Sequence, residues 1–177
     1  MDGGWHLWHN IFGYFEDQWN HNFNVIRQEN RGENFAFVHK NTLFIGLNIV
    51  GGKVHSQAEW HTRLTDNANW MISLLKTHTG GEVNTVILFG HANPTVNHDD
   101  FFFPIRQYMN ESLPRSVKVL YLNGDGHAWK YEPAFFEQEN FLRIQLTGGT
   151  TEPPLKMVVD PSAKLIRSTF LYDRRLL

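Results

Sequence analysis

The sequence of 177 residues contains no cysteine. A disulfide framework, a thiolate nucleophile and a zinc–thiolate site are therefore excluded. A chain without cysteine is compatible with an oxidising or a reducing compartment, so this absence leaves the localisation open. Any metal chemistry must use His, Asp, Glu and Asn, which suit Zn, Mn, Fe or Mg, and ten His is a high count for this length.

Long runs of charged or apolar residues are also missing. Sixteen basic and eighteen acidic residues leave a formal net charge of −2, with no basic stripe. Nucleic acid is therefore not indicated as a partner, and a membrane surface is not indicated either. No apolar run approaches the ~20 residues that cross a membrane. The first residues have neither the basic region nor the apolar core of a signal peptide.

Apolar residues are plentiful at 41%, and aromatic residues make up 14% of the chain. This composition provides a packed interior, and the length fits a single domain over residues 1–177. Trp and Phe recur at helical spacing between Trp5 and Trp19 and predict a helix there. Residues 34–50 are rich in strand formers and predict a hairpin that turns at Asn41-Thr42 and closes at Gly51-Gly52.

The rest of the chain alternates helical and strand patterns. Helices are predicted over residues 57–76 and 101–113, and strands buried on both faces over 85–89 and 117–122. After residue 124 the pattern indicates strands only, a β meander over residues 140–146, 155–159 and 163–172. This order predicts an α/β fold with a mixed β-sheet and flanking helices.

Two polar segments directly follow the predicted buried strands. His91 follows the first strand, and Asp125 and His127 follow the second, each among small residues. Open α/β sheets bind ligands at the carboxyl ends of their strands. In an extended segment Asp125 and His127 would point the same way and could share a metal ion. A single His after a strand is more often structural, and Gly-Asp-Gly alone is an ordinary turn, so the residues leave both readings open.

Residues 86–94 and 119–127 resemble the fourth and the last motifs of the calcineurin-like metallophosphoesterases, in which a strand ends in a metal-binding His. The last motif usually reads G-H-x-H, and this chain is similar to a bacterial and algal subgroup with G-D-x-H. The helix between the motifs and residues 33–37, 43–48 and 140–143 also fit. The resemblance implies one part of that family's four-layer α-β-β-α sandwich. It also implies two divalent metal ions (Zn, Mn, Fe or Mg) and hydrolysis of a phosphomonoester or phosphodiester substrate.

By position, the resemblance implies that His91 binds one metal ion and His127 the other. Asp125 stands in the place of the first His, where a carboxylate can ligate a metal or orient a ligand. The family's earlier motifs, D-x-H, G-D-x-x-D and G-N-H-[DE], do not occur. Residues 97–99 echo the third, but Val96 replaces its Gly and the segment follows His91, so we interpret it as a polar loop. The resemblance thus implies that the sequence starts just after the third motif and that a missing N-terminal half is a partner.

Two non-catalytic hypotheses stand beside this hydrolase. The chain could be a truncated product or remnant that folds only with a partner, since half a sandwich exposes an apolar face and an unpaired edge. It could instead be a β-rich binding module in which Trp129 and Tyr131, near Phe135 and Phe136, stack on sugars. Such aromatic residues more often belong to a core or a pocket wall.

Three arginines stay unassigned. Arg106, Arg115 and Arg143 could each meet a substrate phosphate or form ordinary salt bridges, and the sequence does not separate the two. It identifies no catalytic residue beyond the candidate metal ligands.

Overall fold

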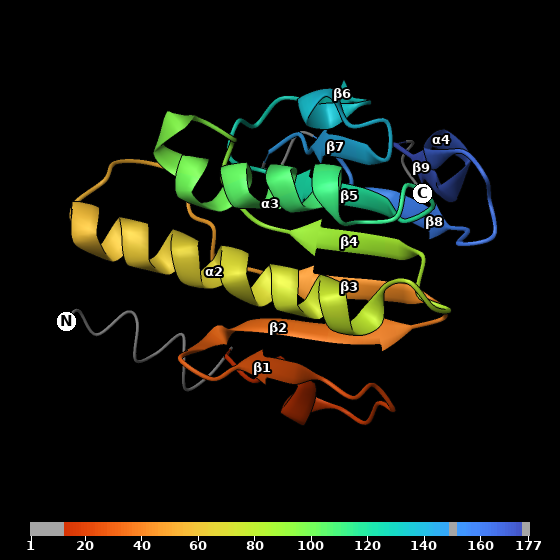
Figure 1. Ribbon diagram of the computed structural model, residues 1–177, viewed down its shortest axis with the longest axis horizontal. Helices are drawn as coiled ribbons and strands as arrows, with labels where there is room; N and C mark the ends of the chain where they lie inside the picture. The colour runs from red at the N-terminus through yellow and green to blue at the C-terminus, as the bar shows by residue number, and fades with distance from the viewer. Residues whose placement is uncertain (1–12, 149–151, 175–177) are drawn as a thin grey trace.

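The computed structural model describes residues 13–148 and 152–174 (Figure 1). Its centre is a seven-stranded mixed sheet in the order β1-β2-β3-β4-β5-β7-β6. The parallel strands are β3 (Thr42–Gly46), β4 (Thr85–Phe89), β5 (Lys118–Asn123) and β7 (Phe141–Gln145). The antiparallel additions are β1 (Ile26–Gln28), β2 (Arg31–His39) and β6 (Lys130–Glu132). The predicted α/β fold with a mixed sheet is confirmed.

The two long helices cover one face of this sheet, in front of it in Figure 1. They are α2 (Gln57–His78) and α3 (Asp99–Glu111). The other face carries a hairpin with a short helix, formed by β8 (Lys156–Val159), α4 (Ile166–Thr169) and β9 (Phe170–Asp173). Single 3-10 turns are η1 (Phe15–Gln18), η2 (Val96–His98) and η3 (Phe135–Glu137). No helix of the described residues has the length and apolarity that a membrane span needs.

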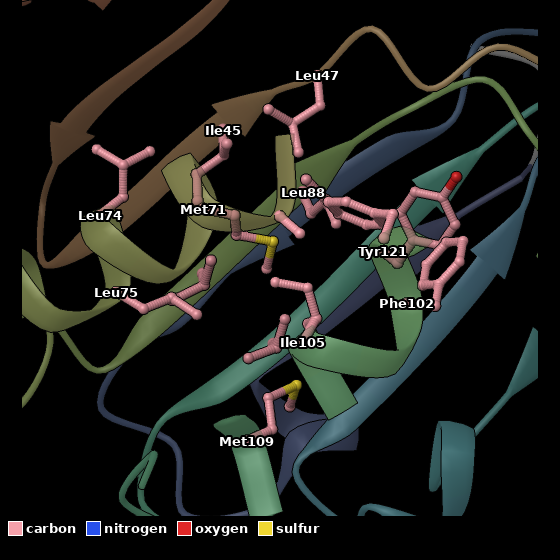
Figure 2. Packing of buried hydrophobic residues seen from close by; sticks show 14 of the residues in the cluster. Ile45, Leu47, Met71, Leu74, Leu75, Leu88, Phe102, Ile105, Met109 and Tyr121 are labelled. Atoms are coloured by element: carbon pink, nitrogen blue, oxygen red, sulfur yellow. The ribbon is translucent and has the colours of Figure 1, made fainter. Parts of the chain in front are cut away.

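The core lies between the helices and the sheet. Met71 of α2 and Ile105 of α3 pack against Ile45, Leu88 and Tyr121 of the parallel strands (Figure 2). All five are 1% exposed or less. Burying a side chain of this size contributes roughly 1.5–3 kcal/mol, so the helices hold the parallel strands, and the loops at their ends, in fixed positions.

The opposite face is aromatic over β2, β3 and β4. Phe37 stacks between Phe44 and Phe23, with ring centroids 4.8 and 5.0 Å apart. Phe89, at the end of β4, is exposed. Helices α2 and α3 lie on the other side of the sheet and do not cover this aromatic face (Phe23, Phe37, Phe44 and Phe89), of which Phe44 packs against the core under the hairpin.

The predicted hairpin exists, but its limits were wrong. The turn consists of Lys40 and Asn41, both with positive φ, a backbone typical of two-residue hairpin turns. Strand β3 ends at Gly46 rather than at residues 51–52. Beyond it, the backbone N–H of Asn48 donates to Asn34 Oδ1 at 2.6 Å, so a side chain replaces the strand ladder.

Three predictions for the chain ends were also wrong. The described part of the helix predicted over 5–19 is one 3-10 turn, and Trp19 is extended; residues 1–12 lie outside the described residues. The strand predicted over 163–172 divides into α4 and β9, because Thr169 N–H donates back to Leu165 O. The β meander is wrong as well, since β7 pairs in parallel with β5, and β6 was missed.

Helix α2 begins at a regular cap, where Ser56 Oγ accepts a hydrogen bond from Glu59 N–H. Arg63 then donates to both carboxylate oxygens of Glu59, at 2.7 and 3.1 Å. This hydrogen bonding lowers the pKa of Glu59 and outweighs burial, which raises it. A carboxyl group with a lowered folded pKa stabilises the fold above its usual pKa and loses that contribution as the pH falls.

We therefore expect wild type to lose more stability between pH 7 and pH 3 than the variant Glu59→Gln. The difference should be about 1 kcal/mol or less, because Glu59 is more than half exposed and solvent screens the pair. Urea unfolding at both pH values measures it, with exposed Glu82→Gln as the control. Equal losses for wild type and Glu59→Gln would contradict the expectation.

Candidate functional site

The loops that follow β4 and β5 meet at the carboxyl edge of the sheet. The two strands are parallel, with Phe89 opposite Leu122, so both chains leave the sheet at the same level. The backbone N–H groups of Gly124 and Asp125 then donate to His91 O at 3.3 and 3.0 Å. His91 N–H donates to Ile49 O in the loop after β3. Three consecutive parallel strands thus position His91 and Asp125.

The side chains of His91 and Asp125 face each other. His91 Nε2 lies 3.4 Å from Asp125 Oδ1, and the side chains are 58% and 30% exposed. Asp125 Oδ2 accepts a hydrogen bond from Asn93 N–H at 3.3 Å, which fixes the carboxylate. Two ligands at 2.0–2.2 Å from one tetrahedral ion lie about 3.4 Å apart. The pair therefore fits two positions of a metal site and stays open to solvent for further ligands.

His127 does not join this pair. The segment from Gly124 to His127 is a turn closed by His127 N–H to Gly124 O, and His127 has φ 49°. The expectation that Asp125 and His127 point the same way assumed an extended segment, and this assumption is wrong. The His127 ring packs instead beside Gly148, where an added Cβ would meet it at 2.6 Å. Within residues 13–148 and 152–174, no group of three His, Asp or Glu side chains could hold a metal ion.

A buried polar cluster supports the loop of His91 from below. Arg143 of β7 is 5% exposed and donates to Asn123 Oδ1, Asn93 Oδ1 and Gln145 Oε1 at 2.7–2.9 Å. Arg143 Nη1 donates to Glu132 Oε2 of β6 at 2.5 Å. The guanidinium is thus satisfied inside the protein and positions Asn93 rather than meeting a substrate phosphate.

Sequence reasoning missed this cluster, although Arg143 was one of the three unassigned arginines. The signal was the position of Arg143 in the middle of an apolar strand, where a charge requires partners. Arg106 forms an exposed pair with Glu137 at 3.0 Å. Arg115 donates to Gln138 Oε1 and to Asn110 Oδ1.

Tyr121 braces the same loop from β5. Its hydroxyl donates to Ala92 O at 2.6 Å, and burial raises its pKa, so it stays neutral and keeps donating at physiological pH.

His98, in the segment that echoes the family's third motif, is buried. Its ring nitrogens lie 3.0 Å from Thr95 Oγ1 and 2.9 Å from Val50 O, so both are engaged inside the protein.

The aromatic residues considered for sugar stacking pack inward. Trp129 and Tyr131 contact the core on the hairpin side of the sheet, with Tyr172 5.2 and 5.8 Å from their ring centroids. Trp129 also lines a pocket of about 240 Å³ and lies under the guanidinium of Arg174. Phe135 and Phe136 pack against the core on the helix side of the sheet. Sugar binding stays an untested prediction.

Comparisons with known proteins add no assignment. No protein-family model matches the chain. Neither the curated proteins nor the solved structures gave a match.

The close approach of Gly51 to Asp125 allows a test of the site's geometry. A Cβ at Gly51 would lie 2.4 Å from Asp125 Oδ2, whereas a Cβ at Gly124 would meet nothing within 4 Å. We expect Gly51→Ala to displace the carboxylate from His91 and to weaken Zn²⁺ binding about tenfold or more. The stability should fall by about 1 kcal/mol or less, because the atoms that give way are the end of the partly exposed Asp125 side chain and not a packed core.

Competition with a chelating dye measures the metal affinity, and urea unfolding measures the stability. Gly124→Ala is the matched control and should bind as wild type does. Equal metal affinities for the two glycine variants would show that Asp125 is not placed as described.

Proposed function

We propose that this protein takes part in metal-dependent hydrolysis of a phosphomonoester or phosphodiester, with His91 and Asp125 as metal ligands. The observation that carries the proposal is their approach to 3.4 Å at the ends of adjacent parallel strands. The order of the motifs around these residues supports it, because it resembles that of the calcineurin-like metallophosphoesterases. The resemblance also gives a ligand role to His127, which the separation from the pair does not support.

In this proposal, some residues of the site bind the metal ion and others hold the ligands in position. His91 presents Nε2 and Asp125 presents Oδ1 to the ion, while Asn93 N–H holds Asp125 Oδ2. Arg143 and Tyr121 keep the loop of His91 at a fixed height above the sheet. Divalent ions in such a site would activate a water for attack on phosphorus and offset negative charge on the phosphoryl oxygens.

The aromatic face supports the second part of the proposal, that the sheet belongs to a four-layer sandwich. In that architecture two sheets pack face to face with helices outside. Here the long helices α2 and α3 lie on one face, and the other carries the hairpin with α4 and, beside it, Phe37, Phe44 and Phe89. We propose that the occupant of the aromatic face is the second sheet of the family, carrying the motifs D-x-H, G-D-x-x-D and G-N-H-[DE].

The test starts from the coding sequence upstream of Met1, where we expect these three motifs in frame. A protein extended to include them should hydrolyse p-nitrophenyl phosphate or its diester. EDTA should abolish the activity, and Mn²⁺ or Zn²⁺ should restore it. Hydrolysis that is unaffected by EDTA would overturn the proposal.

A stop codon or an unrelated sequence upstream would instead favour the non-catalytic hypothesis. The isolated chain should then aggregate through the aromatic face unless it is co-expressed with a partner. A soluble and cooperatively folding monomer would count against that alternative.

A further inference from the structure

A second cleft opens at the opposite edge of the sheet, at the amino ends of β5 and β7. Its volume is about 840 Å³, and its lining includes Lys118, Asn140 and Tyr131. Small-molecule sites usually enclose roughly 300–1,000 Å³. Along β5, Lys118 and Asn123 lie about 17 Å apart at ~3.3 Å per residue. The cleft is therefore separate from the pair of His91 and Asp125.

Lys118 is the buried cation of this cleft. It is 9% exposed, and in the described part of the chain its ammonium forms no hydrogen bond and no ion pair. Its neighbours on the same side of β5, Leu120 and Leu122, belong to the apolar core under the hairpin. Lys118 Nζ is not one of the side-chain atoms that are fully buried without a partner, so the ammonium at the end of the buried stem opens to the cleft and is available to an anionic ligand.

The nearby acidic groups do not neutralise Lys118. Asp160 is fully exposed, and its pKa is lowered mainly by hydrogen bonds from Ser162 and only last by Lys118. Asn140, opposite Lys118 at the start of β7, has a neutral side chain whose Nδ2 donates to Val117 O. Its Oδ1 is buried without a hydrogen-bond partner among the described residues.

The cleft as a whole is positive. Three further cationic side chains line it, namely Arg115, Lys164 and Arg167. Against these four cations stand two carboxylates, Glu137 and Glu139, and Glu137 is bound to Arg106 at 3.0 Å. The lining thus carries a formal net charge of two positive units. A phosphate monoester carries about −1.5 to −2 at pH 7, which matches this charge.

The walls beside the cations are apolar and aromatic. Tyr131 of β6 is half-buried, and Ile166 of α4 packs against the same core. Burial raises the pKa of Tyr131, so its hydroxyl keeps its proton and is able to donate to an anion. The cleft therefore offers cations for a phosphate and a ring for the organic group attached to it.

We propose that this cleft binds a phosphorylated small molecule, with Lys118 meeting the phosphate group and Tyr131 contacting the organic part. This inference does not depend on the proposed hydrolase, because it concerns the other edge of the sheet and its test requires no turnover. The cations on the rim, such as Arg167, attract the ligand, and Lys118 holds the phosphate at the base of the cleft.

The experiment is calorimetric titration of the 177-residue chain with phenyl phosphate in the presence of EDTA, which removes any metal. Wild type should bind saturably, more weakly at high salt because charges hold the ligand. Phenol, which has the same ring without the phosphate, should not bind. Lys118→Met should weaken binding about tenfold or more, since a buried pairing with a charge is lost.

Two variants make the outcome decisive. Arg167→Gln alters an exposed residue, preserves the fold and should weaken binding about threefold through its loss of charge. Lys53→Met removes an exposed lysine from the loop after β3, at the other edge, and should leave binding unchanged. The proposal is overturned if wild type does not bind, if Lys118→Met binds as tightly as wild type, or if only Lys53→Met weakens binding.

Discussion

Replacing Arg143 by Met should destabilise the protein by about 2–4 kcal/mol, because the buried amide oxygens of Asn123 and Gln145 each lose a donor at a cost of roughly 1–3 kcal/mol. The substitution leaves the Glu132 carboxylate without its cation, and it removes donors from Asn93, Asn123 and Gln145 in the interior. Because Asn93 also holds Asp125, the loop of the candidate site should loosen at the same time.

Urea unfolding followed by circular dichroism measures this loss. Arg106→Met is the matched control, since it breaks an exposed arginine–glutamate pair and should cost about 1 kcal/mol or less. Arg143→Lys should fall between the two, because an ammonium keeps the charge without the planar set of donors. A loss at position 143 no greater than that at position 106 would mean that Arg143 is solvated rather than buried.

The second large effect concerns turnover. In a protein that carries this chain together with the three earlier motifs proposed above, His91→Ala should lower metal-dependent phosphoester hydrolysis about 100-fold or more. Removing a ligand should exceed the 10–100-fold effect of removing a residue that only orients one. Asp125→Asn should lower it as well, because the amide is a poorer ligand than the carboxylate.

A second histidine–aspartate pair supplies the control for these variants. His61 Nδ1 lies 3.0 Å from Asp100 Oδ2, on the exposed surfaces of α2 and α3. His61→Ala should leave turnover as in wild type. Unchanged turnover in His91→Ala would remove His91 from the site.

The sequence predicted the parallel part of the fold well, because buried strands have a strong local signal. The apolar run at residues 85–89 and the amphipathic pattern from residue 57 gave β4 and α2 nearly at their observed limits. Which distant strands pair with each other was harder to predict from the sequence. Nothing local distinguishes a strand that pairs in parallel, as β7 does with β5, from one in a meander.

Two residues of the candidate site were also predicted, because the parallel strands that precede them were recognised from the sequence. His91 and Asp125 follow strands whose ends lie together, so topology alone brings them near each other. His127 was placed from an assumed extended backbone, but its left-handed φ turns it away. The apolar neighbours of Arg143 and Lys118 in the sequence indicated burial, but the partners of each side chain were not predicted, because they depend on which strands flank β5 and β7.

The most direct test of the central claim is calorimetric titration of the chain with Zn²⁺, comparing wild type, His91→Ala and His61→Ala. If His91 and Asp125 form part of a metal site, wild type and His61→Ala should bind one ion with similar affinity, and His91→Ala should bind it about tenfold or more weakly. Equal affinity in wild type and His91→Ala, or a loss confined to His61→Ala, would contradict the assignment.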